Sequence, residues 1–190
     1  MGEVKALKLY TIQSLNILNQ LALGRYVCDA KKSGFIQEWG FKDAYDWMVE
    51  QMISRVGVPP EKIEYPVWAF ADIDNPNWMS GGFGVPGDVM IRVDVEIDES
   101  RVVMSDFDGW HSVLNDYPFF DTYEEYDSFE EMDSECQEKV KLDSWQRIFR
   151  EHSDEGCQIT FWELRLEDVI GVTLFVVPEQ EEHFGEEECK

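Results

Sequence analysis

Residues 89–97 read VMIRVDVEI, and this stretch decides the fold. Apolar side chains occupy every second position from Val89 to Ile97, and charged residues fill most of the positions between them. Successive side chains of a strand point to opposite faces, so a period of two predicts a strand with one buried face. Strands of this kind are typical of antiparallel sheets.

Outward from this strand, the apolar pattern alternates between periods of two and of about 3.6. Further strands are expected over 8–13, 65–71, 102–104, 158–164 and 171–177. Helices are expected over 15–22, 41–56, 109–115 and 142–149. The order of the elements predicts an α+β fold: a single compact domain with a mixed, mainly antiparallel sheet and three or four helices.

The domain is expected to span residues 1–178, because 190 residues fit one domain and 44% of them are hydrophobic. Residues 179–190 are acidic and have little to bury, so we expect a frayed tail. Residues 121–138 hold nine acids and no base, interleaved with aromatic side chains. This stretch is expected to form either a solvated helix or an ordered loop.

The formal net charge is −24, and its distribution is uneven. Residues 1–62 hold eight Lys or Arg against seven Asp or Glu, whereas residues 63–190 hold eight against 33. Such a surface repels nucleic acid and anionic membranes, so neither is expected as a partner. It attracts basic proteins or divalent cations, although improved solubility alone also explains it.

No apolar stretch is long enough to cross a bilayer, and the amino end lacks a signal-peptide pattern, so a cytoplasmic location is expected. The four cysteines form no CxxC pair, which favours isolated reduced thiols over a zinc site. We expect no metal site.

Several phrases resemble the bacterial family called domain of unknown function 3841. They are LYTIQ at 9–13, YDWM at 45–48, YPVW at 65–68, SDF at 105–107 with Trp110-His111, Ser144-Trp145 with Ile148-Phe149, and Gln158 with TFWEL at 160–164. The resemblance runs from Leu9 to about Phe175. It implies no particular activity.

The layout also resembles, more distantly, ADP-ribosyltransferase-like domains, which bind NAD in a cleft between two small sheets. The shared features are an opening strand, a helix ending at a glycine, and a glutamate on a late strand. The resemblance implies NAD as a cofactor, although the complete His-Tyr-Glu or Arg-Ser-Glu triad of such domains is not found in this chain.

Transfer of ADP-ribose needs a carboxylate for the cationic transition state, an aromatic ring to stack on nicotinamide, and donors for the pyrophosphate. The best carboxylate is Glu163, which shares a strand face with Phe161 and Arg165. The other candidates are Thr11 and Gln13 as donors, Trp68 or Tyr65 for stacking, and Arg25 with Lys31 and Lys32 for phosphate. Alternatively, Glu163 is a structural residue paired with Arg165 or a nearby lysine.

A second pair of catalytic candidates, Asp106 and His111, lies at a junction between an expected strand and an expected helix. Asp106 is expected to cap the helix, and His111 to act as an acid or base. The alternative for His111 is a half-buried, hydrogen-bonded side chain.

Three functions therefore stay open. The first is a nucleotide-using transferase of the ADP-ribosyltransferase type, which requires one cleft lined by Thr11, Gln13, Trp68 and Glu163. The second is an acidic protein without enzymatic activity that binds a basic protein through 121–138 and imitates the charge of nucleic acid. The third is a small-ligand module that uses Trp78 and Phe83 in the loop 72–87.

Overall fold

The computed structural model describes residues 5–28, 36, 40–61, 63–71, 73–74, 78, 84–150 and 156–179. Among the sequence predictions, Lys31, Lys32, Phe83 and the tail from residue 180 onward lie outside the described residues.

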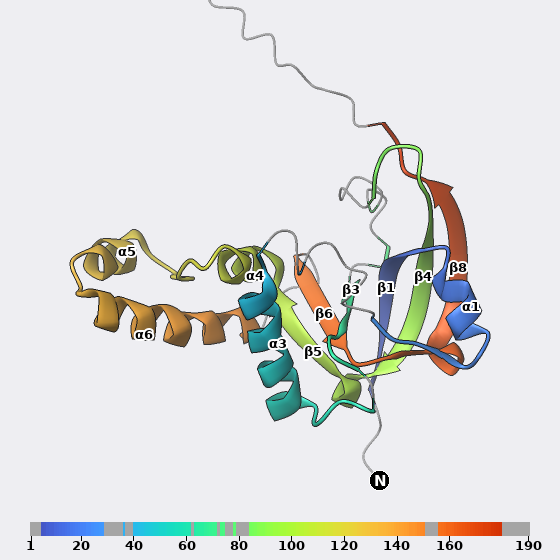
Figure 1. The fold of residues 1–190 in the computed structure, drawn as a ribbon, viewed down its shortest axis with the longest axis horizontal. Helices are drawn as coiled ribbons and strands as arrows, with labels where there is room; N and C mark the ends of the chain where they lie inside the picture. The colour runs from blue at the N-terminus through green and yellow to red at the C-terminus, as the bar shows by residue number, and fades with distance from the viewer. Residues whose placement is uncertain are drawn as a thin grey trace, which may run out of the picture.

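A six-stranded sheet forms the centre of the protein (Figure 1). Its order is β5-β6-β3-β1-β4-β8. The strands are β1 (Ala6–Ser14), β3 (Val67–Phe70), β4 (Val89–Asp98), β5 (Val102–Asp106), β6 (Cys157–Phe161) and β8 (Val169–Val176). Two short strands, β2 (Arg25–Tyr26) and β7 (Leu164–Arg165), pair beside it. Every strand pair in the described part is antiparallel, and the sheet is combined with helices, so the predicted α+β fold with a mainly antiparallel sheet is confirmed.

Five α-helices occur in the described residues, one or two more than expected. They are α1 (Ile17–Leu21), α3 (Lys42–Arg55), α4 (Phe107–Leu114), α5 (Tyr123–Glu130) and α6 (Ser134–Trp145). Short 3-10 turns follow as η3 (Glu99–Arg101), η4 (Gln146–Phe149) and η5 (Leu166–Asp168). The additional helices come from the acidic stretch 121–138, which forms α5 and the first turns of α6.

Helix α3 shows how local sequence sets an element. Its apolar stripe buries Ala44, Met48 and Met52 against the sheet side of the molecule. The helix ends where Gly57 adopts a φ of 110°, and the Gly57 N–H donates to the carbonyls of Met52 and Ile53. A left-handed glycine after the last helical residue is a common helix end, as the sequence predicted.

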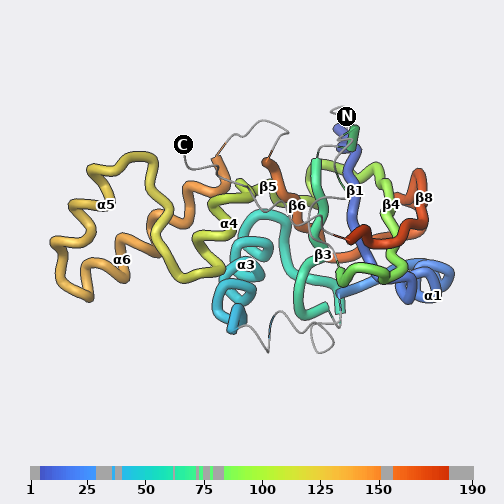
Figure 2. The backbone as a smooth tube through the Cα atoms, turned by 90° about the horizontal axis from the view of Figure 1, so that it is seen from above, coloured from blue at the N-terminus to red at the C-terminus, as the bar shows by residue number. Residues whose placement is uncertain are grey.

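The two faces of the sheet carry different cores. On one face, apolar side chains of β1, β3, β4 and β6 pack with Ile17 and Leu21 of α1. On the other face, Trp68 of β3 packs into a cluster formed by α3, α4 and the end of α6. Helices α5 and α6 extend beyond α4, away from the sheet, in both views (Figures 1 and 2).

Candidate functional site

An aromatic pocket lies where β1, β3 and β6 meet α3 and α4, with a volume of about 490 Å³. We call it the aromatic pocket. Its lining includes Ile12, Gln13, Tyr26, Cys28, Phe41, Tyr45, Trp68, Phe70, Phe107, Trp110, His111, Leu114, Asn115 and Gln158. A concave, mainly apolar site with a few polar groups is the usual form of a small-molecule site.

Three aromatic side chains from three different elements form one wall. Trp68 of β3 lies 4.6 Å from Trp110 of α4 between ring centroids, with the planes tilted by 32°. Tyr45 of α3 meets both rings edge-on, at 5.9 Å from Trp68 and 5.5 Å from Trp110. These rings give the pocket flat apolar surfaces suited to another ring.

Two buried polar atoms in this lining have no hydrogen-bond partner in the described structure: Trp68 Nε1 and Gln158 Oε1. One is a donor and the other an acceptor. Trp68 and Gln158 lie on adjacent strands, because Trp68 pairs with Thr160 and Phe70 pairs with Gln158. Each such atom costs about 1–3 kcal/mol when it stays unpaired, so an unpartnered donor and acceptor in one pocket need an explanation.

The two donors predicted on the first strand have different roles. Gln13 lines the pocket, and its Nε2 donates to Thr11 Oγ1 at 2.8 Å. Thr11 is fully buried, and its Oγ1 donates to the carbonyl of Trp68 at 2.7 Å. Thr11 therefore fixes β1 against β3 and orients Gln13, and it offers no donor to the cavity.

Asp106 and His111 each make a hydrogen bond to the backbone of the first turn of α4. The Asp106 Oδ1 accepts from the Gly109 N–H at 2.6 Å, so its predicted role as a helix cap is confirmed. His111 lines the pocket, and its Nδ1 lies 2.8 Å from the carbonyl of Phe107. Because a carbonyl only accepts, Nδ1 is the donor in this hydrogen bond.

Tyr65 lies behind the pocket wall, edge-on to Tyr45 at 5.9 Å. Its Oη donates to Asp46 Oδ1 at 2.7 Å, and burial together with this carboxylate raises the pKa of Tyr65 to about 12. Burial likewise raises the pKa of Tyr45 to about 12. Both phenols stay protonated at neutral pH and supply surface and hydrogen bonds, not a base.

Glu163 and Arg25 lie elsewhere, in a shallow hollow formed by β2 and β7 with their flanking residues. Glu163 is 7% exposed, and its two oxygens pair with Arg25 Nη1 at 2.7 Å and Arg165 Nε at 2.8 Å. Burial opposes ionisation, but the hydrogen bonds from both arginines outweigh it and lower the pKa of Glu163. The alternative reading of Glu163 as a partner of Arg165 is therefore the one observed.

This placement corrects two expectations. The strand expected to carry Glu163 on a shared face with Phe161 ends at Phe161 as β6, because the chain turns there before β7. The expected cleft of Thr11, Gln13, Trp68 and Glu163 does not form: Gln13 and Trp68 line the aromatic pocket, Thr11 is buried below them, and Glu163 belongs to the other hollow.

Trp78 is also outside the aromatic pocket. It packs edge-on against Phe175 of β8, with ring centroids 4.8 Å apart, and lies 5.1 Å from the Arg92 guanidinium. Its role within the described residues is packing, and the other aromatic residue predicted for that loop, Phe83, lies outside them.

Several residues that line the pocket were not among the site residues predicted from the sequence. Tyr45 belongs to the apolar stripe of α3 and reads as core, while Trp110 and Gln158 appear only within the phrases that carry the family resemblance. Phe70 and Phe107 also line the pocket, with ring centroids 6.4 Å apart and planes tilted by 48°, and neither was predicted as a site residue. Nothing in the spacing of these residues indicates that they meet.

Among the described residues, no three His, Cys, Asp or Glu side chains lie together so as to hold a metal ion. No described helix has the length and apolarity that crossing a membrane requires.

The fold and the pocket together define a class: an α+β domain in which two helices cover one end of an antiparallel sheet and enclose an aromatic pocket. The family model of the domain of unknown function 3841 matches residues 8–170, so the chain belongs to this family. Comparisons with curated proteins and with solved structures give no match.

Proposed function

We propose that this protein binds a small molecule through a planar heteroaromatic ring, of the nucleobase or nicotinamide type, in the aromatic pocket. The observation that carries the proposal is the unpartnered pair of Trp68 Nε1 and Gln158 Oε1 in a wall of aromatic rings. An amide-like ring edge presents an acceptor beside a donor, which complements this pair. The ring itself stacks on the apolar faces of Trp68 and Trp110.

Both unpartnered atoms are shielded from solvent, so binding requires the side chains of Gln158 and Trp68 to turn toward the cavity. The two hydrogen bonds gained then offset the cost that the free protein carries. This gives a ligand with the matching edge an advantage over an apolar ring of the same size.

NAD contains both ring types and is the ligand suggested by the sequence. The proposal concerns binding, because the carboxylate expected to assist ADP-ribose transfer, Glu163, is held by Arg25 and Arg165 in a separate hollow. His111 lines the pocket and supplies a polar side chain that is suited to contact a ligand.

Titration calorimetry and thermal shift with nicotinamide, adenine, ADP-ribose and NAD test the proposal. A ligand that binds the folded state raises the melting temperature in a saturable way. ADP-ribose lacks the nicotinamide ring, so its comparison with NAD identifies which ring occupies the pocket.

The variant Gln158→Met removes the whole side-chain amide, including Oε1, at similar length, and Trp68→Phe removes the indole N–H but keeps an aromatic ring. We expect each to weaken binding by about tenfold or more, since a lost buried hydrogen bond costs about 1–3 kcal/mol. Glu163→Gln is the matched control and keeps wild-type affinity. The proposal is wrong if no ring in the panel binds, or if Gln158→Met and wild type bind the ligand equally.

A further inference from the structure

Residues 121–145 form a protruding helical pair, which we call the acidic arm. Helices α5 and α6 lie alongside each other and project beyond α4, at the end of the molecule far from β8 (Figures 1 and 2). The sequence left open whether residues 121–138 are helix or loop. The structure shows two capped helices, with Thr122 as the N-cap of α5 and Asp133 as the N-cap of α6.

Specific contacts hold the arm in one shape. Phe120 packs edge-on against Tyr126 at 4.9 Å and Phe129 at 5.6 Å. Arg147 donates to both oxygens of Glu125, at 2.9 and 2.5 Å. These hydrogen bonds, with one from the Asp121 N–H, lower the pKa of Glu125 to about 2. A charge-assisted pair of this geometry fixes α5 against the end of α6.

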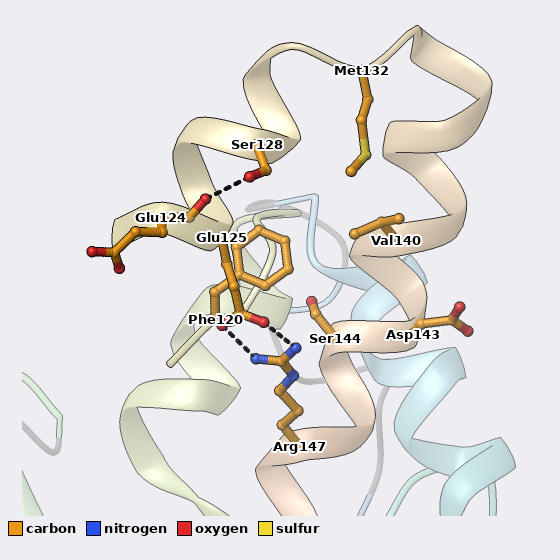
Figure 3. Close-up of a pocket in the computed structure, with 9 residues that line it drawn as sticks. All are labelled: Phe120, Glu124, Glu125, Ser128, Met132, Val140, Asp143, Ser144 and Arg147. Carbon is orange, nitrogen blue, oxygen red and sulfur yellow. Dashed lines mark hydrogen bonds and ion pairs between the residues drawn. The ribbon is translucent and has the colours of Figure 1, made fainter. Parts of the chain in front are cut away.

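A groove of about 400 Å³ lies between the two helices. Phe120, Met132 and Val140 provide its apolar surface. Figure 3 shows Met132 and Val140 at one end of the groove and the Glu125–Arg147 pair at the other, with the carboxylates of Glu124 and Asp143 pointing outward on opposite sides. The groove is therefore apolar inside and acidic along its sides.

The charge on the arm is largely uncompensated. Of the nine acids in 121–138, ion pairs within the described residues engage Asp121, Glu125 and Glu138. The other six are exposed: Glu124, Asp127, Glu130, Glu131, Asp133 and Glu135. Holding that many like charges on one small element costs stability unless an opposite charge approaches.

We propose that the groove of the acidic arm binds a basic segment of a partner protein, which inserts an apolar side chain between Met132 and Val140. Lys or Arg residues that flank this anchor pair with Glu124 on one side and Asp143 on the other. An apolar anchor in a groove with a charged rim is how many peptide-binding surfaces work. This binding activity is independent of the aromatic pocket, which lies on the sheet side of α4.

The chemistry of the arm favours this occupant over others. A second copy of the chain carries a formal net charge of −24 and is repelled, as is nucleic acid. The carboxylates of the arm are spread along its surface, and the part of the chain described here has no cluster placed to hold a metal ion. Tyr123, which is 87% exposed at the start of α5, adds apolar contact surface next to Glu124.

The test uses a fluorescein-labelled peptide in which Leu residues at helical spacing alternate with Lys and Arg, and a second peptide with Ser in place of every Leu. Fluorescence anisotropy with the full-length protein measures both affinities over a series of salt concentrations. We expect the Leu peptide to bind at least about tenfold more tightly than the Ser peptide, and the affinity of both to fall as salt screens the charges.

Two sets of variants separate the groove from general attraction. The triple variant Glu124→Gln, Glu131→Gln and Asp143→Asn weakens binding by about tenfold or more, because it removes two carboxylates that line the groove and the one next to Met132 in sequence. The matched triple Glu50→Gln, Glu61→Gln and Glu96→Gln removes the same charge from exposed positions elsewhere and has a much smaller effect.

The double variant Met132→Ser and Val140→Ser removes the advantage of the Leu peptide and leaves binding of the Ser peptide unchanged. Circular dichroism confirms that α5 and α6 are kept in each variant. Equal binding of the two peptides to wild type, or equal losses in the two charge triples, would overturn the proposal in favour of nonspecific attraction. Self-association of the free protein through the arm, seen by ultracentrifugation, would also overturn it.

Discussion

Gln158 shows how one side chain can serve binding at the expense of stability. It is 7% exposed, and its Oε1 has no partner among the described residues. Methionine has a similar length and no such atom, and replacing an unsatisfied polar group by an apolar one of similar shape is often neutral or stabilising.

We therefore predict that Gln158→Met raises the melting temperature by about 2–4 °C, which corresponds to about 1 kcal/mol for a domain of this size. Differential scanning calorimetry measures this change on the ligand-free protein. Gln158→Leu, which leaves a gap, serves as a comparison. A clear loss of stability in Gln158→Met would mean that Oε1 is satisfied in solution and is not available to pair with a ligand.

Glu163 is the residue whose role changed most between sequence and structure. Its pKa is lowered, so its contribution to stability is fully present above the pKa of about 4.5 that the group has in the unfolded chain, and is lost as the pH falls through the lower folded-state pKa. The ion pairs with Arg25 and Arg165 join the segment after β6 to β2 and β7.

We predict that Glu163→Gln lowers the free energy of unfolding by about 1–3 kcal/mol at pH 7, because charge-assisted hydrogen bonds are lost. The difference from wild type shrinks as the pH falls below 4.5. Urea unfolding at several pH values measures both effects, with the exposed Glu61→Gln as control. A difference that stays constant down to strongly acidic pH would contradict the assignment of the ion pairs.

At the scale of elements, the packing of α4 against Phe119 and Ile148, which lie just before and just after the acidic arm in the chain, depends on one glycine. Gly109 is buried in α4, and a Cβ at this position would lie 2.8 Å from Ile148 Cγ2 and 3.0 Å from the ring of Phe119. Its backbone is helical, so the requirement is close approach and not an unusual φ.

Gly109→Ala is therefore expected to destabilise the protein by about 1–3 kcal/mol through overpacking, although alanine has the higher helix propensity. Thermal unfolding gives the size of the effect. Gly57→Ala is a useful contrast, because no atom lies within 4 Å of its added Cβ and the cost arises from its φ of 110°. Stabilisation by Gly109→Ala would show that the helices separate at this contact in solution.

The sequence of the acidic stretch 121–138 did not distinguish a helix from an ordered loop, and the contacts of α5 and α6 explain why. Nine acids without a base predict a solvated segment, and the residues that fix α5 and α6 are mainly outside it. Arg147 and Lys141 lie later in the chain, and Lys141 is held at 2.7 Å from both Asp116 and Glu138. The order of this stretch is thus set by cations that the local pattern does not contain.

For the whole molecule, the concentration of charge has a direct thermodynamic consequence. A net charge of −24 opposes the compact state through self-repulsion, and added salt screens this repulsion. Ion pairs such as Glu163 with Arg165 are weakened by salt as well, but they are few compared with the excess of acids.

We predict that the melting temperature at pH 7 rises between low salt and about 0.2 M NaCl, where the Debye length is below about 10 Å. KCl serves as the matched salt, and an equal response to both indicates screening and not specific ion binding. A falling melting temperature would mean that the ion pairs outweigh the repulsion.

The sequence by itself determined the elements and the class of fold. The alternation of 89–97 is strand β4, the stripe of 41–56 is helix α3, and Asp106 caps α4, because each depends on neighbours a few residues away. It also placed Gln13, Trp68 and His111 among the candidates that do line the pocket.

Only the tertiary structure decided which candidates meet. Trp68, Trp110 and Gln158 come from β3, α4 and β6, and their convergence depends on strand order β5-β6-β3-β1, which no local spacing reports. Glu163 does not line the pocket, because the chain turns after Phe161 and two arginines hold its carboxylate in a separate hollow. Local patterns record propensity and periodicity, whereas a site is formed by long-range packing and charge pairing between distant segments.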